Sequence, residues 1–391
     1  MKAIINGVLI THRKQLSGQV LLYDDRIRAV IPQNQFIPAQ DMEIIDAGGA
    51  FVAPGFINIH IHGCAGRDVM DEDAGAIGVM CDVLPATGVT SFLATTMTYD
   101  RPRIERTLAR IRTSMQDHHG AQVLGAHMEG PFISPVYKGA QAEDNITAPD
   151  FSWLEPYADI IKVITLAPEQ AAGQRFFESC RHHHIILSMG HSAATYEDAR
   201  EAITRGGVHH VTHLFNAMSP MHHRKPGLVG AALDFPDVMC ELICDNLHVH
   251  PMLQRLVYGT KGVSGMELIT DSMRACLLGD GVSELGGQTV FVSQGEARLA
   301  DGTLAGSILT MDRAIYNFQH NTGAPLPEII AMVTENPAQE LGLFDYLGSL
   351  EEGKYADIVL FDEALRIRQT IIRGNVAYSQ QKEEMNTCLG S

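Results

Sequence analysis

Residues 54–63 read Pro-Gly-Phe-Ile-Asn-Ile-His-Ile-His-Gly, an apolar run that contains two closely spaced histidines. An apolar run bounded by Pro-Gly on one side and Gly on the other predicts a buried strand over Phe56–His62. His60 and His62 lie two residues apart near its end, and successive side chains alternate between the faces of a strand. Both imidazoles therefore point to the same face.

Seven similar apolar runs follow, alternating with helical patterns at a spacing of about thirty residues, which is typical of repeated βα units. Eight such units in fewer than about 300 residues predict an α/β fold, a TIM-like (β/α)8 barrel. The alternative, a doubly wound open sheet, lacks a Gly-x-Gly-x-x-Gly turn after its first strand. The further strands are predicted at Ser91–Thr96, Val123–Glu129, Ile161–Leu166, Ile185–His191, His209–Leu214, Leu242–Asp245 and Met266–Asp271.

Both ends of the chain contain short β-like runs broken by polar turns, and neither end has enough apolar residues for a core of its own. We expect residues 1–52 and 347–391 to pair into a small β-sandwich domain beside a barrel formed by residues 53–346. Gly281–Gly302 is predicted as a hairpin inserted after the eighth barrel strand.

Composition excludes several classes of partner. The 391 residues include 29 Lys and Arg against 46 Asp and Glu, a net charge of −17, which repels nucleic acids and anionic membranes. No apolar run approaches the roughly 18 residues of a membrane span, and residues 1–7 lack the pattern of a signal peptide. Seven scattered cysteines are typical of reduced thiols. We therefore expect a cytoplasmic protein with no nucleic-acid or membrane partner.

Polar residues close several of the predicted strands, whose carboxyl ends meet at one opening of a barrel. Taken singly, each histidine has an ordinary interpretation as a hydrogen-bonded core residue, and each acid as a helix cap. Six such residues at the same end of the barrel favour a site for a divalent transition metal, zinc or iron. Glu129 could bridge two ions at this site. The predicted ligands are His60, His62, Glu129, His191, His213 and Asp271.

Several longer motifs identify a family. The opening strand and the run Gly353–Val359 resemble the amidohydrolase superfamily. Six further runs resemble, more narrowly, its N-acetylglucosamine-6-phosphate deacetylase family: His127–Phe132, Gly190–Ser192, Thr212–Met218, His248–Pro251, Thr270–Asp271 and Leu304–Ser307. The resemblance covers essentially the whole chain. It implies hydrolysis of the acetamide of N-acetylglucosamine-6-phosphate to glucosamine-6-phosphate and acetate.

The resemblance also implies how the metal is held. Glu129, His191 and His213 would bind the principal ion. His60 and His62 would add a second ion, partly shared through Glu129 or Asp271. Members of the family without this histidine pair work with one ion, so one or two ions per subunit are expected.

The resemblance assigns roles in catalysis and substrate binding. Asp271 is expected to act as general base, and His248 to polarise the carbonyl oxygen. Arg224 matches the phosphate-binding arginine of the family, which acts across a subunit interface, so a homodimer is expected. The expected contacts to the sugar phosphate come from Ala140, Gln141, Asn216, Ala217, Arg224, His248 and Ile308.

Three alternatives stay open. Gln141 stands where the family commonly has a histidine, which makes N-acetylgalactosamine-6-phosphate a competing substrate. A cyclic amide hydrolase or deaminase of the same superfamily is disfavoured, because the fourth strand ends Thr165-Leu166-Ala167-Pro168 without a lysine. A non-catalytic assembly protein is disfavoured by the retention of all six predicted ligands.

Overall fold

The computed structural model describes residues 1–11, 13–117, 119–171 and 175–380 of the chain. Eight parallel strands, neighbours in chain order, form one sheet in which each of the eight predicted ranges overlaps one observed strand. The strands are β6 (Phe56–Ile61), β9 (Val89–Thr96), β10 (Gln122–Glu129), β11 (Ile161–Leu166), β12 (Ile186–Met189), β13 (His210–Val211), β14 (Met239–Ile243) and β15 (Met266–Ile269).

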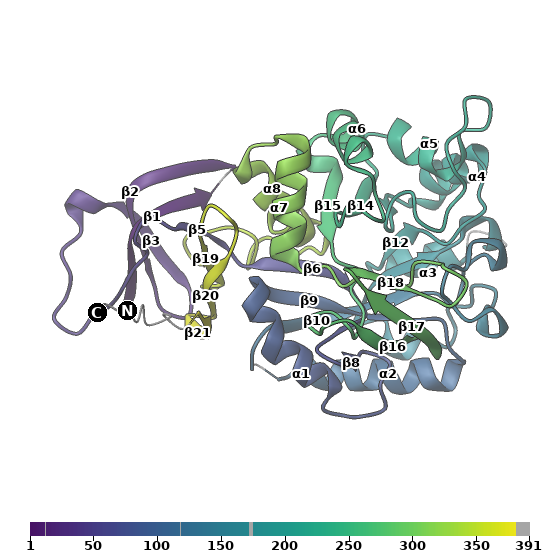
Figure 1. Ribbon diagram of the computed structural model, residues 1–391, viewed down its shortest axis with the longest axis horizontal. Helices are drawn as coiled ribbons and strands as arrows, with labels where there is room; N and C mark the ends of the chain where they lie inside the picture. Colours follow the sequence, from purple (N-terminus) through teal and green to yellow (C-terminus); the bar gives the residue numbers. More distant parts are fainter. Residues whose placement is uncertain (12, 118, 172–174, 381–391) are drawn as a thin grey trace, which may run out of the picture.

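Backbone hydrogen bonds between the first and last strands close this sheet. The amide of His62 donates to the carbonyl of Ser272, and the amide of Asp271 donates to the carbonyl of His60, both at 2.9 Å. Helices cover the outside of the ring (Figure 1). The predicted (β/α)8 barrel is confirmed. The helices are α1 (Ala76–Val83), α2 (Arg101–Ser114), α3 (Arg175–His182), α4 (Tyr196–Glu201), α5 (Gly227–Asp234), α6 (Pro251–Lys261), α7 (Met311–Thr322), α8 (Leu326–Met332) and α9 (Glu335–Glu340).

Five strands, β6, β12, β13, β14 and β15, end one to three residues earlier than predicted. β12, β13 and β15 each stop two residues before His191, His213 and Asp271, which the sequence pattern placed inside the strands. These three residues have φ angles of 47°, 31° and 47°, in the left-handed region. A left-handed residue leaves the extended backbone conformation, so the strand ends and the side chain takes a new direction.

The connection from β10 to β11 has no α-helix among its described residues. It contains three short 3-10 turns instead, at Pro135–Tyr137, Glu143–Asn145 and Glu155–Tyr157. This long loop starts directly after Glu129 and carries Gln141 back over the opening of the barrel.

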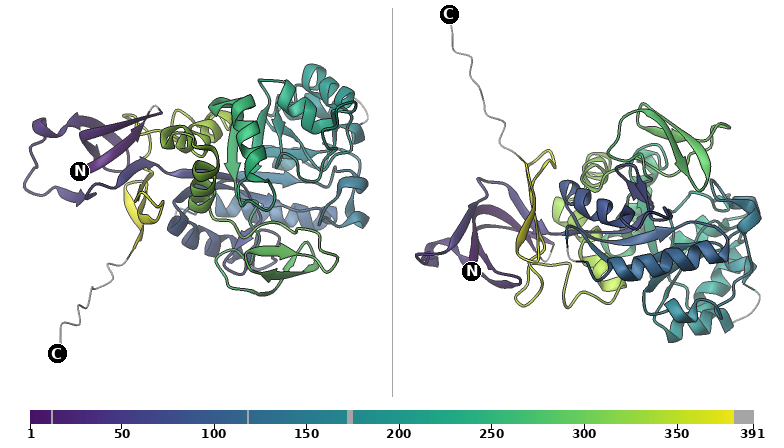
Figure 2. Two further views of the ribbon diagram at one scale, coloured as in Figure 1. Left: turned by 45° about the horizontal axis from the view of Figure 1, so that its top comes forward. Right: turned by 90° about the horizontal axis from the view of Figure 1, so that it is seen from below.

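The two ends of the chain share a second sheet, as predicted. Strands β5 and β19 pair antiparallel and join the N-terminal and C-terminal strands. Figures 1 and 2 show the purple and yellow strands side by side at one end of the molecule. Its strands are β1 (Lys2–Thr11), β2 (Lys14–Tyr23), β3 (Ile27–Pro32), β4 (Glu43–Asp46), β5 (Phe51–Pro54), β19 (Ile358–Phe361), β20 (Ile367–Ile372) and β21 (Asn375–Ser379).

This terminal domain has one core built from both ends of the chain. Ile4, Leu21 and Ile27 pack with Ile358 and Ile371 and are fully buried. All eight strands belong to one hydrogen-bonded sheet, so the two layers of the predicted sandwich are continuous with each other. The chain then passes from β5 to β6 across the single residue Gly55.

The predicted hairpin after the eighth barrel strand is a three-stranded meander. Its strands β16 (Gly281–Leu285), β17 (Gln288–Ser293) and β18 (Glu296–Arg298) pair antiparallel. A small ribbon of β7 (Gly63–Cys64) and β8 (Arg67–Asp68) follows β6. The meander stands out from the barrel in Figure 2. Among the described residues, no helix has the length and apolar run needed to cross a membrane.

Candidate metal centre and active site

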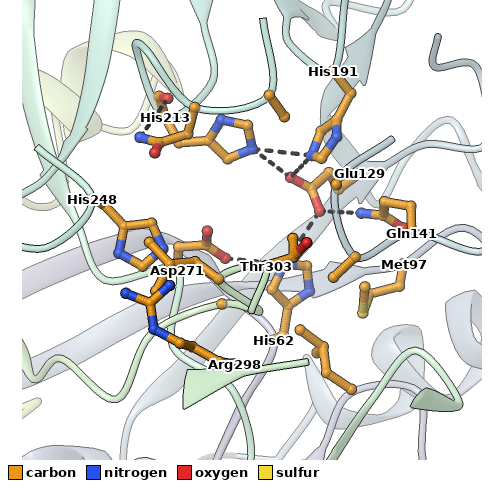
Figure 3. A pocket seen from close by; sticks show the side chains of 17 residues that line it. His62, Met97, Glu129, Gln141, His191, His213, His248, Asp271, Arg298 and Thr303 are labelled. Carbon is orange, nitrogen blue, oxygen red and sulfur yellow. Dashed lines mark hydrogen bonds and ion pairs between the residues drawn. The ribbon is translucent and has the colours of Figure 1, made fainter. Parts of the chain in front are cut away.

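A cavity of about 370 Å³ lies at the carboxyl ends of the barrel strands. Figure 3 shows its side chains converging from several strands and from the inserted meander. Of the predicted site residues, the cavity is lined by His62, Glu129, Ala140, Gln141, His191, His213, Asn216, Ala217, His248 and Asp271. Most of the polar residues that line the cavity were thus among the predicted site residues.

The first cluster of possible metal ligands is Glu129, His191 and His213. Glu129 Oε1 lies 3.1 Å from His191 Nε2 and 3.0 Å from His213 Nε2, and these two ring nitrogens are 3.1 Å apart. All three side chains are buried. Two imidazole nitrogens at this separation repel each other unless a proton or a cation lies between their lone pairs.

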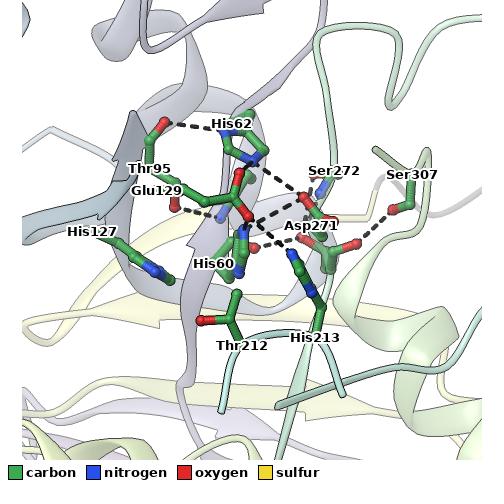
Figure 4. A network of polar contacts seen from close by, with 12 residues as sticks. His60, His62, Thr95, His127, Glu129, Thr212, His213, Asp271, Ser272 and Ser307 are labelled. Atoms are coloured by element: carbon green, nitrogen blue, oxygen red, sulfur yellow. Dashed lines mark hydrogen bonds and ion pairs between the residues drawn. The ribbon is translucent and has the colours of Figure 1, made fainter. Parts of the chain in front are cut away.

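The second cluster surrounds the other side of the Glu129 carboxylate (Figure 4). His62 Nε2 lies 3.3 Å from Glu129 Oε2 and 3.2 Å from Asp271 Oδ1. His60 Nε2 lies 3.5 Å from Glu129 Oε1 and equally far from Asp271 Oδ1. Both carboxylates thus face both imidazoles of the His-x-His pair.

These residues fit a divalent cation. The ligand atoms of His60, His62 and Glu129 lie within 4.8 Å of one another, and so do those of Glu129, His191 and His213. His60 Nε2 is buried and has no hydrogen-bond partner among the described residues, which is costly unless another group completes it. Imidazole nitrogens with shared carboxylates are the donor set of a borderline transition metal.

The two carboxylates are ionised at neutral pH. Burial alone would raise the pKa of Glu129, but the nearby His191, together with hydrogen bonds from His191, His213 and His62, lowers it well below its usual range. Burial would likewise raise the pKa of Asp271, but His60 and His62 lower it to about 2. Both side chains are therefore able to bind a cation, and Asp271 to accept a proton.

His248 reaches the cavity from the segment after β14. Its Nδ1 hydrogen-bonds Asp245 Oδ2 at 2.6 Å, which leaves Nε2 as the free ring nitrogen. Burial alone would lower the pKa of His248, but Asp245 raises it above its usual value. His250, in the same motif, instead caps α6 by accepting the amide of Met252 at 3.2 Å.

Gln141 lines the cavity and also bonds a predicted metal ligand. Its amide nitrogen donates a hydrogen bond to Glu129 Oε2, and its amide oxygen accepts one from the backbone of Thr98 at 2.7 Å. The side chain is buried. Gln141 therefore holds the carboxylate that both clusters share, a role that sequence spacing did not indicate.

Arg224 and Ile308 are the two predicted substrate contacts that do not line this cavity. The Arg224 side chain is exposed and bonds His223 Nε2 at 2.8 Å, beside a separate surface hollow. Ile308 is half-buried against the core. Within one chain, Arg224 thus points away from the other predicted site residues.

Other residues of the cavity were missed by sequence reasoning. Arg298, on β18, is the one arginine or lysine among its described lining residues. Its Nε binds Glu296 Oε2 at 2.6 Å and its side chain is 41 % exposed. A strand-like pattern predicted this segment, but no pattern shows which edge of an inserted meander turns toward the barrel.

The chain is similar to known proteins over most of its length. The sequence profile of the amidohydrolase family matches residues 51–377. The N-acetylglucosamine-6-phosphate deacetylase of Bacillus subtilis (strain 168) is 40% identical over 382 residues, 94% of each chain. The N-acetylgalactosamine-6-phosphate deacetylase of Escherichia coli O157:H7 is 34% identical over 92% of this chain and 94% of its own.

The fold is similar over the same extent. The crystal structure of N-acetylglucosamine-6-phosphate deacetylase from Pasteurella multocida superposes with a TM-score of 0.92 at 32% identity, covering 97% of this chain and 100% of that one. The barrel and the terminal domain thus recur together in a solved relative. The chain belongs to the amidohydrolase family and, within it, to the N-acetylglucosamine-6-phosphate deacetylase family.

Proposed function

We propose that this enzyme hydrolyses the acetamide of N-acetylglucosamine-6-phosphate to glucosamine-6-phosphate and acetate. The observation that carries this proposal is one buried carboxylate, Glu129, shared between two sets of imidazoles at the base of a cavity of about 370 Å³. That volume suits a small polar substrate. The relatives from Bacillus subtilis and Pasteurella multocida are N-acetylglucosamine-6-phosphate deacetylases, which supports the choice of sugar.

Glu129, His191 and His213 would hold the principal ion, and His60, His62 and Asp271 would complete a second position. The mixed nitrogen and oxygen donors favour zinc or iron. When bound, such an ion supplies a Lewis acid that polarises the amide carbonyl and lowers the pKa of water toward about 7.

Asp271 is the proposed general base. It is ionised at neutral pH, so it takes a proton from the attacking water as the new C–O bond forms. It then delivers that proton to the nitrogen as the C–N bond breaks, which turns a poor leaving group into a free amine. Protons are balanced, and the products are acetate and the amino sugar.

His248 is proposed to stabilise the carbonyl oxygen. Asp245 fixes its Nδ1, so the ring presents Nε2 to the cavity. Because the pKa of His248 is raised, Nε2 carries a proton over a wider pH range and donates it as a hydrogen bond where negative charge develops.

The phosphate needs a cationic partner in an acidic protein. Arg224 is outside the cavity of its own chain, which supports the proposal that it reaches the cavity of a second copy in a homodimer. Arg298 is the one arginine or lysine among the described residues that line the cavity of their own chain. Variants of both arginines separate the two possibilities, as described in the Discussion.

N-acetylgalactosamine-6-phosphate is the second candidate substrate. By the resemblance, Gln141 stands where the family commonly has a histidine, and the relative from Escherichia coli O157:H7, at 34% identity, is an N-acetylgalactosamine-6-phosphate deacetylase. The two sugars differ only in the configuration of one hydroxyl, so contacts on that side of the ring decide between them.

The test is acetate release from the 6-phosphates of N-acetylglucosamine, N-acetylgalactosamine and N-acetylmannosamine, paired with elemental analysis of the same preparation. We expect the highest kcat/KM for N-acetylglucosamine-6-phosphate. A higher value for the galactose epimer would select the second candidate. Ammonia release or ring opening of a cyclic amide, without acetate release from any of these sugars, would overturn the proposal.

We further place the enzyme in the cytoplasm. The six described cysteines are all free and buried, and the net charge is −17. Buried free thiols at all six described positions suit a reducing compartment. Fractionation of cells that express the tagged protein tests this placement.

A further inference from the structure

Beneath the cavity, one buried carboxylate touches both clusters of possible metal ligands. Glu241, on β14, is fully buried and does not line the cavity. Its Oε2 accepts a hydrogen bond from His60 Nδ1 at 2.8 Å and a second from the backbone amide of His213 at 3.0 Å. A single oxygen atom thus joins the His60 ring to the backbone of the principal cluster.

This contact determines which nitrogen of His60 faces the cluster. A carboxylate accepts hydrogen bonds, so the proton of the neutral ring lies on Nδ1. The lone pair of Nε2 then points toward Glu129 Oε1 and Asp271 Oδ1, each 3.5 Å away. An outer carboxylate that orients a histidine in this way also raises its strength as a metal ligand.

Glu241 could instead belong to a third cation site with His60 and His127, since these three residues also bring ligand atoms within 4.8 Å. The bonding of His127 excludes that interpretation. Its Nδ1 bonds the carbonyl of Ile59 at 2.9 Å, and its Nε2 bonds the hydroxyl of Thr165 at 2.7 Å. Neither nitrogen of His127 is free for a cation.

We propose that Glu241 is a positioning residue that presents His60 Nε2 as a ligand and so enables the chain to hold a second ion between Glu129 and Asp271. This inference rests on the proposed metal dependence of the site, not on the identity of the sugar. Glu241 does not line the cavity, and its proposed effect on the second ion passes through His60.

The test is a titration of metal-free protein with Zn²⁺ against a chromophoric chelator, with elemental analysis after dialysis. We expect two ions per wild-type chain and one per chain in His60→Asn. Glu241→Gln keeps a hydrogen-bonding group but removes the charge. It should retain the first ion and bind the second about 10- to 100-fold more weakly.

Glu267→Gln is the matched control. Glu267 is equally buried, lies on the neighbouring strand β15, and pairs with His210 rather than with a ligand. This variant should bind both ions with wild-type affinity. If Glu241→Gln does not fold, Glu241→Asp keeps the charge but withdraws the oxygen from His60, and should weaken the second ion in the same way.

Three results would overturn the proposal: wild-type protein that binds one ion, a Glu241 variant that binds two ions with unchanged affinity, or equal weakening in Glu267→Gln. These readouts do not use acetate release. A failed deacetylase assay with two bound ions would therefore contradict the proposed reaction and leave the role of Glu241 intact.

Discussion

Three side chains of the candidate site share an unusual backbone conformation. His191, His213 and Asp271 each follow the end of a barrel strand by two residues, with φ between 31° and 47°. Left-handed conformations of residues other than glycine cost about 1–3 kcal/mol each and persist where the surrounding structure enforces them. Here the turn directs each side chain across the opening of the barrel.

Substitution of Asp271 tests its role as general base. Asp271→Asn keeps the size of the side chain but cannot accept the proton of water, so kcat should fall by about 10²–10⁴-fold with KM nearly unchanged. Steady-state acetate release measures both constants. The exposed Asp237→Asn is the control and should behave as wild type. An Asp271→Asn enzyme with near-normal kcat would remove Asp271 from the mechanism.

Gly190 permits the close approach of strands beside His191. A Cβ at this position would lie 2.8 Å from Thr212 Cβ and 2.9 Å from Thr165 Cγ2. Gly190→Ala should therefore lower the free energy of unfolding by about 1–3 kcal/mol, as overpacking does. Gly259→Ala, in helix α6 with no atom within 4 Å of the added carbon, should be neutral or stabilising. Urea unfolding compares the two, and equal stabilities would refute the packing argument.

At the scale of elements, strands β13 and β15 are linked inside the barrel by His210 and Glu267, whose Nε2 and Oε2 lie 3.3 Å apart. Burial alone would lower the pKa of His210, but the hydrogen bond that its ring donates to Glu267 raises it to about 9. Burial raises the pKa of Glu267 to about 7 despite this partner. Both groups bind protons more tightly in the folded state than in the unfolded state.

This pair predicts a loss of stability with rising pH. The contribution of His210 is complete below pH about 6.5, its unfolded pKa, and is lost as the pH rises through about 9. Glu267 acts in the same direction between pH about 4.5 and 7. The Tm of Glu267→Gln should therefore fall less than that of wild type between pH 5 and pH 9. Parallel Tm curves would show that the pair does not titrate in this range.

For the whole molecule, the proposed homodimer predicts that variants of Arg224 and Asp271 complement each other. If Arg224 completes the cavity of a second copy, Arg224→Ala alone should raise KM for phosphorylated sugars, because phosphate attraction is largely shared by ground and transition states. When Arg224→Ala and Asp271→Asn proteins are mixed 1:1 and their chains exchange freely, half of the dimers contain one chain of each variant. In such a dimer one site combines Asp271 of the first chain with Arg224 of the second. About a quarter of the sites should then regain wild-type KM.

The alternative is that Arg298 binds the phosphate. It lies on the same chain as the cavity, so an Arg298→Ala enzyme mixed with Asp271→Asn should not recover. An unchanged KM in Arg224→Ala, with a raised KM in Arg298→Ala, would assign the phosphate to Arg298 instead. Sedimentation velocity measures whether the mixed species is a dimer.

Much of this molecule followed from local patterns. Mostly apolar runs such as Ile161–Leu166 predicted the barrel strands because a strand buried on both faces is largely apolar. Because neither chain end has enough apolar residues for a core of its own, the two ends were predicted to share one core. Ile4 and Ile358 belong to such a shared core. The division of the chain near residues 53 and 347 stays a prediction.

The sequence by itself determined the fold class, the family and the polar residues at the strand ends, because periodicity and residue type are properties of short stretches of chain. Only the tertiary structure shows that Gln141 bonds Glu129, that Glu241 bonds His60, and that Arg298 lines the cavity of its own chain while Arg224 does not. Those roles depend on which side chains meet across strands far apart in sequence. Backbone turns such as those at His191 and Asp271 also change the direction of the side chain, and sequence spacing does not predict that direction.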